Sequence, residues 1–168
     1  MNWGLFIVQW LHVGLGVLWF GTVLFNATIL IPAISRLPLA QQRTVGRVVG
    51  DQGFRVILPV SVAVIVLGIL RGTVFGPIKG LEDLGTGYGI TWLVALAFAI
   101  GAFSWAEWLI RPALNRMNAI PEAEAIGSDG QPTAVLEAAI ADVKRKTILE
   151  LGLFLVIFTC MILMRLGI

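Results

Sequence analysis

The chain contains a single histidine, and its position is the most informative chemical feature of the sequence. His12 lies within the first of four strongly apolar stretches, and an ionisable side chain inside a membrane span is a candidate functional residue. The imidazole group is a common ligand of transition metals and of haem iron. Because no second histidine exists, ligation of haem by two histidines of one chain is excluded.

Two methionines fall at the outer level of the predicted membrane, as His12 does. Met161 and Met164 are three residues apart, so they share one face of a helix. Imidazole and thioether ligands together suit Cu(I). The sequence therefore predicts an outer-half site for binding or transport of copper, with His12, Met161 and Met164 as ligands and Arg71 as a counter-charge.

The same region allows a haem b site as a second interpretation. His12 would be an axial ligand of the iron, and Arg71 and Arg165 would pair with the propionates. A third interpretation is a structural membrane subunit without a cofactor. Methionines at helical spacing often serve packing, and a histidine between membrane helices is often simply hydrogen-bonded. The three interpretations stay open at this point.

No catalytic constellation accompanies these residues. The sequence has no Cys-x-x-Cys pair, no His-x-x-x-His pair, no glycine-rich phosphate loop and no nucleophile triad. We therefore name no catalytic residue and favour a non-enzymatic role, while catalytic activity stays open at this point. Cys160 is the sole cysteine, so no intrachain disulfide can form.

The composition predicts an all-α integral membrane four-helix bundle. Hydrophobic residues make up 58% of the 168 and charged residues only 13%, whereas about a quarter of a soluble domain is charged. Four stretches approach the ~20 apolar residues that cross a bilayer. They cover residues 5–31, 56–75, 90–110 and 147–166, and we expect them to form a single transmembrane domain, residues 1–168.

The distribution of positive charge predicts the orientation. The loop between the first two spans has four arginines and the loop between the last two has five basic residues, whereas the middle loop has only Lys79. Lys and Arg accumulate on the cytoplasmic side, so we expect a bacterial-type inner membrane with both termini outside. The lipid bilayer is then the main partner. Gly14 and Gly21 also permit a homodimer, and nothing indicates nucleic acid.

A second polar set lies near the inner membrane face. It comprises Asn26, Glu107, Arg111, Lys146 and Glu150. Glu107 with Arg111, and Lys146 with Glu150, have the four-residue spacing of ion pairs on a helix. We interpret the set as a structural ion-pair network. A proton or ion path through Glu107 and Glu150 is the alternative.

Prolines predict where the inner segments become helical. Pro38 is expected to open a short helix before the second span. Pro132 is expected to open a helix that continues to Leu166, too long for a bilayer, with its first turns in the cytoplasm. Pro121–Gln131 is predicted to be a flexible loop.

A faint internal repeat marks the inner ends of the first and third spans. Residues 31–36 read Ile-Pro-Ala-Ile-Ser-Arg, and residues 111–116 read Arg-Pro-Ala-Leu-Asn-Arg. Two parallel helical hairpins related by an axis along the membrane normal would produce this pattern. Independent convergence of helix ends on proline and arginine is the alternative.

Short motifs resemble those of a known family. Leu11-His12, then Leu18-Trp19-Phe20-Gly21 and Pro32 follow an opening-helix pattern of histidine, Trp-x-Gly and a late proline. Tyr88-Gly89 and Arg111-Pro112 begin and end the third span in a similar way. This arrangement resembles the copper resistance protein D (CopD)-like superfamily of small four-helix membrane proteins. The resemblance implies a four-helix membrane fold and copper handling.

Overall fold

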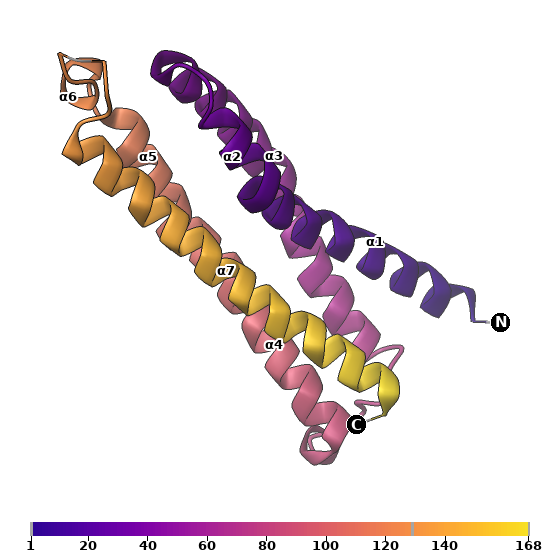
Figure 1. Cartoon of the computed structure of the whole chain (residues 1–168). Coiled ribbons are helices and arrows are strands. Elements are labelled where there is room, and N and C mark those ends of the chain that lie inside the picture. Colours follow the sequence, from indigo (N-terminus) through magenta and orange to yellow (C-terminus); the bar gives the residue numbers. More distant parts are fainter. Residues whose placement is uncertain (1, 129, 168) are drawn as a thin grey trace. The chain divides into compact units, whose positions relative to one another are not determined.

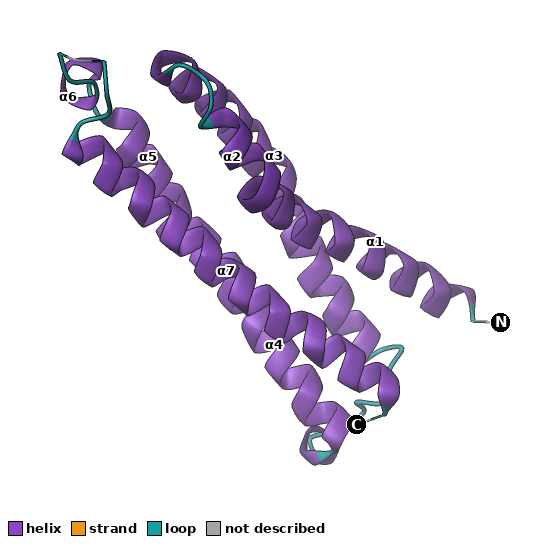
Figure 2. Ribbon diagram, in the orientation of Figure 1, coloured by secondary structure: helices purple, strands orange, loops and turns teal. Residues whose placement is uncertain are grey.

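The structure, a computed structural model, describes residues 2–128 and 130–167 (Figure 1). Its described part is 85% helical and contains no β-strand, as the ribbon coloured by secondary structure shows (Figure 2). The predicted all-α class is therefore confirmed. The elements are α1 (Trp3–Phe25), η1 (Asn26–Leu30), α2 (Ile31–Ile34), α3 (Leu39–Gly72), η2 (Glu82–Gly85), α4 (Gly87–Trp105), η3 (Ala106–Ile110), α5 (Arg111–Ala119), α6 (Glu122–Ala125) and α7 (Ala134–Leu166).

Within the described residues, four helical runs are long and apolar enough to cross a membrane. They are Trp3–Ile34, Leu39–Gly72, Gly87–Ala119 and Ala134–Leu166. Many of their large apolar side chains are exposed, including Trp10 (66%), Val17 (66%) and Leu155 (60%). Such side chains suit lipid, and a helix satisfies its own backbone hydrogen bonds there. The chain is accordingly a helical membrane protein.

The helices around the two arginine- and lysine-rich loops differ in part from the expectation. α7 runs unbroken from Ala134 to Leu166, which confirms the single long helix. α3 begins directly after Pro38, but it continues through Pro59 to Gly72, so no separate short helix precedes the second span. The segment expected to be a loop contains α6, and the Thr133 N–H donates to the Ala125 carbonyl at 3.0 Å.

The described residues form two compact units, and each includes parts of the long helices. Unit 1 comprises residues 2–21, 57–103 and 152–167, and unit 2 comprises Thr22–Val56 and Ser104–Leu151. In unit 1, Trp19 of α1 packs edge-on against Phe154 of α7, with ring centroids 4.9 Å apart. Small buried residues on α4, Ala95 and Ala99 among them, let neighbouring helices approach closely.

A widened helical turn precedes proline in both copies of the sequence repeat. In η1 the Ile31 N–H donates to the Asn26 carbonyl, and in η3 the Arg111 N–H donates to the Ala106 carbonyl. Both bonds span five residues instead of four. Proline has no N–H and its ring clashes with the carbonyl four residues earlier, so a wider turn accommodates Pro32 and Pro112. The repeat therefore extends from the sequence to the backbone.

Candidate functional site

A cavity of about 550 Å³ lies within unit 1. Side chains of α1, α3, α4 and α7 line it, and most of them are apolar. Small-molecule sites commonly have volumes of roughly 300–1,000 Å³. All of the ligand candidates from the sequence are in its lining: His12, Arg71, Met161, Met164 and Arg165.

The His12 ring is fixed by the backbone of α3. Its Nδ1 lies 3.0 Å from the Val64 carbonyl oxygen, and a carbonyl only accepts, so Nδ1 carries the hydrogen and donates. In the neutral imidazole, Nε2 then has a free lone pair. Nε2 has no hydrogen-bond partner among residues 2–128 and 130–167. A metal-binding histidine typically shows this arrangement, with one ring nitrogen donating to a carbonyl.

A glycine allows the imidazole to lie against α3. A Cβ at Gly68 would come within 3.1 Å of the His12 Cε1 atom, which is tighter than ordinary van der Waals contact. One turn of α3 therefore makes two contributions to the position of His12. Val64 supplies the carbonyl that its ring bonds, and Gly68 leaves the space in which the ring lies.

Trp92 of α4 is also held by the α3 backbone. Its indole Nε1 donates to the Gly68 carbonyl at 3.2 Å. The ring occupies the space that a Cβ at Gly72 would need. Trp92 lines the cavity together with Tyr88, and neither was predicted as a site residue.

Arg71 is oriented by a residue that the sequence analysis missed. Its Nε donates to the Gln9 Oε1 atom at 2.6 Å. Gln9 is an uncharged residue in an apolar run, so charge patterns do not reveal it. It lies three residues before His12, however, and this spacing on one helix face could have identified it.

A second cavity, of about 520 Å³, adjoins the first. Its lining consists of Asn2, Leu5, Phe6, Gln9, Arg71 and Arg165. The last three residues also line the larger cavity, so their side chains lie where the two meet. Neither arginine forms an ion pair with any other residue in the described part of the chain.

The methionines form part of the α7 wall of the larger cavity. Met161 and Met164 are both half-buried. Cys160, the residue before Met161, is buried and has a free thiol. No group of three or more His, Cys, Asp or Glu side chains suited to a metal occurs in the described ranges. Any metal here would depend on His12 and on ligands of other types.

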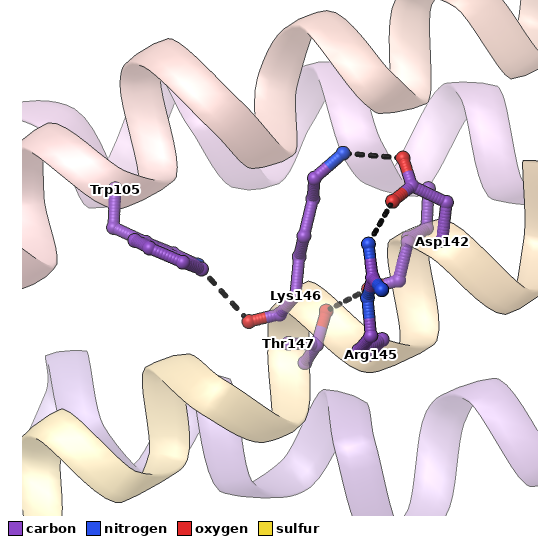
Figure 3. A network of polar contacts seen from close by, with 6 residues as sticks. Trp105, Asp142, Arg145, Lys146 and Thr147 are labelled. Carbon is purple, nitrogen blue, oxygen red and sulfur yellow. Dashed lines mark hydrogen bonds and ion pairs between the residues drawn. The ribbon is translucent and has the colours of Figure 1, made fainter.

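Unit 2 contains the second polar set of the sequence, which comprises Asn26, Glu107, Arg111, Lys146 and Glu150. The expected ion pair between Lys146 and Glu150 is wrong. Lys146 binds Asp142, and Arg145 lies 3.3 Å from the same carboxylate (Figure 3). The expected partner, Glu150, forms no ion pair with the residues the structure describes. An acid four residues before a base is the better order on a helix, which favours Asp142 over Glu150.

The second expected ion pair of the inner set is present. The Arg111 guanidinium lies 2.8 Å from the Glu107 carboxylate, which confirms that ion pair. The same guanidinium lies 5.4 Å from the centre of the Phe54 ring, a cation–π distance. The Trp105 indole donates to the Lys146 carbonyl at 3.1 Å (Figure 3). These contacts join the helices of unit 2.

Comparisons with known proteins identify no relative: no family model, no curated protein and no solved structure matches this chain.

Proposed function

We propose that the protein is a membrane haem-binding protein whose iron ligand is Nε2 of His12. The observation that carries the proposal is the hydrogen bond from His12 Nδ1 to the Val64 carbonyl, at 3.0 Å. That bond selects the tautomer with a free lone pair on Nε2 and restrains the ring. The same bond would also suit a histidine that only joins two helices, so the additional support is that Nε2 has no partner among the described residues while His12 lines a cavity.

The cavity volume favours haem over a bare ion. About 550 Å³ is far more space than a single metal ion occupies, and it lies within the range for organic ligands. The largely apolar walls suit a porphyrin face, and the half-buried Met161 and Met164 are thioethers on the α7 wall. Bound haem would supply a redox-active iron whose potential the axial ligand and the surrounding polarity adjust.

Copper binding is the second candidate, and a separate observation favours it. One imidazole and two thioethers line the same cavity, and soft thioether ligands select Cu(I). The motif resemblance to the CopD-like superfamily agrees with this candidate. Under it, the surplus volume would be a passage for the ion, and the positive charge of Arg71 would oppose the ion instead of balancing it.

Absorbance and elemental analysis of the purified full chain decide between the two. Haem gives a Soret band and iron in equal amount to haem, whereas copper gives bound metal without that band. We expect His12→Ala to shift and broaden the Soret band of protein reconstituted with haem, because the iron loses its axial ligand, and to leave the helical circular dichroism unchanged. Met161→Leu is the matched variant, because it keeps the volume of the α7 wall while removing one thioether.

Each result has a definite meaning. A Soret band that is equal in position and intensity in the wild type and in His12→Ala would refute ligation by His12. Loss of bound copper in both His12→Ala and Met161→Leu, without any haem uptake, would replace the haem proposal by the copper one. Neither haem nor copper bound by the wild type would refute both.

A further inference from the structure

We propose that Gln9, Arg71 and Arg165 form an acid-recognition subsite, so that the cavity takes amphipathic acids in preference to neutral apolar molecules. These three side chains line both cavities. The inference rests on the proposed function only in assuming that the larger cavity holds an organic ligand. It does not depend on ligation by His12, because the acid group and not a metal is recognised.

The first argument is the way in which Arg71 is held. Its Nε donates to Gln9 Oε1 at 2.6 Å, and a guanidinium has five N–H donors. The Gln9 bond uses one of them and restrains the plane of the group. The remaining four, on the two Nη nitrogens, are available for the paired hydrogen bonds that arginine forms with carboxylate or phosphate.

The second argument is uncompensated charge. In the described residues of unit 1 the side-chain carboxylates are Glu82 and Asp83. Asp83 accepts hydrogen bonds from the backbone N–H groups of Lys79 and Gly80. Neither carboxylate forms an ion pair with Arg71 or Arg165, in the part of the chain that is described. Two cations beside one cavity repel each other, and an anion between them removes that repulsion.

The third argument is the division of polarity. The larger cavity is bounded by side chains such as Trp19, Phe20 and Leu96, whereas the residues shared with the second cavity are polar. A ligand that fits both regions has an apolar body and an acid group at one end. Arg71 and Arg165 both lie in the last turn of a helix, where the helix dipole stabilises a positive charge. The dipole does not explain the hydrogen bond between Arg71 and Gln9.

The test uses metal-free protoporphyrin IX, a dicarboxylic acid, and its neutral dimethyl ester. Both are titrated by fluorescence into the full chain in lipid nanodiscs, and binding to empty nanodiscs is subtracted. We expect the wild type to bind the diacid at least about tenfold more tightly than the diester, as one charge-assisted hydrogen bond would provide. Equal affinities, or no binding of the diacid, would overturn the proposal.

Variants assign the preference to the subsite. Arg71→Gln and Arg165→Gln should each reduce the preference for the diacid, whereas Lys79→Gln, which removes a cation of the same unit outside both cavities, should keep it. Gln9→Glu retains an acceptor for Nε but adds a negative charge, so it should also reduce the preference. A structural role of Gln9 alone would leave the preference intact in Gln9→Glu and would contradict its assignment.

Two further experiments complete the test. One separates the acid subsite from the haem proposal, and the other separates carboxylate ligands from phosphate ligands. His12→Ala should still prefer the metal-free diacid, so a failed haem proposal and a failed acid subsite give different results. Displacement of protoporphyrin by dioleoyl phosphatidic acid would assign the subsite to phosphates as well as carboxylates. Displacement by oleate alone would restrict it to carboxylates. An unchanged preference in both arginine variants would refute the subsite.

Discussion

Two glycines of α3 determine how closely side chains from other helices approach it. Gly68 lies beneath the His12 ring, and Gly72 leaves the space that the Trp92 indole fills. Both side chains also bond a backbone carbonyl of α3. His12 Nδ1 donates to the Val64 carbonyl, and Trp92 Nε1 donates to the Gly68 carbonyl. Space and hydrogen bond therefore come from the same stretch of backbone, and an added methyl group would disturb both.

Gly72→Ala should destabilise the protein. Its Cβ would clash with the Trp92 indole and break the bond from Nε1 to the Gly68 carbonyl, and such overpacking costs about 1–3 kcal/mol. Thermal unfolding in nanodiscs measures the change. Gly14→Ala is the control, because its Cβ would meet no heavy atom within 4 Å and alanine favours the helix. Equal unfolding midpoints for the two variants would show that the Trp92 contact is unimportant.

The loop between α3 and α4 should show a pH-dependent contribution from Asp83. Backbone N–H groups of Lys79 and Gly80 donate to its carboxylate and hold its pKa below the ordinary value. A lowered folded-state pKa means that the stabilisation is complete above about pH 3.9, the usual pKa of the unfolded side chain. It is lost as the pH falls through the folded-state pKa.

Asp83→Asn tests this contribution. The variant should unfold at a lower temperature than the wild type at neutral pH, and the gap should close in strong acid. Glu82→Gln, from the same turn, is the matched control. A gap that stays constant from neutral pH down into strong acid, below the folded-state pKa of Asp83, would mean that the charge of Asp83 has no part in it.

At the scale of elements, the long helix α7 was predictable and the widened turns were not. Apolar spacing without a breaker indicates a continuous helix after Pro132, and α7 is continuous. Pro32 and Pro112, by contrast, predict only a disturbance of the helix. A proline can end a helix, kink it or follow a widened turn, and packing that is absent from the sequence decides among these outcomes.

Arg43 of α3 should hold the end of α5 in place. Its guanidinium donates to the backbone carbonyls of Asn118, at 3.3 Å, and Ile120. Carbonyls at a helix C-terminus lack partners within the helix, so Arg43 satisfies groups that would otherwise be unpaired. Arg43→Gln should increase hydrogen exchange in residues 115–126. Arg47→Gln, one turn further along α3, should not, and equal exchange in both variants would contradict this role.

At the scale of the whole molecule, the all-α class and the four apolar helices follow from composition and from the positions of the apolar stretches along the chain. The partners of the site residues do not. His12 bonds the carbonyl of Val64, a group that every residue possesses, so no spacing or residue type indicates it. Lys146 has an acid four residues away on either side, Asp142 and Glu150. The acid-before-base order already favours Asp142, and the folded helix has that pair.

The orientation with both termini outside the cell remains a prediction from the positive-inside rule. Single cysteines at Gly85 and Gly130, in a Cys160→Ala background, should react oppositely with a membrane-impermeant thiol reagent. Gly85 lies at the end of η2 and should be labelled in intact cells, whereas Gly130 should be labelled only after permeabilisation. The reverse pattern would invert the topology.

The two widened turns bear on the ancestry of the chain. Pro32 and Pro112, each preceded by such a turn, are as far apart in sequence as His12 and Trp92. Duplication of an ancestral two-helix gene would produce this register, and a product of that gene would have worked as two identical copies. His12 and Trp92 would then descend from one position, although both bond carbonyls of α3, so these two contacts do not follow the symmetry of the repeat. After such a fusion the two copies would have been free to diverge, and one of them would have kept or acquired the single imidazole of the chain.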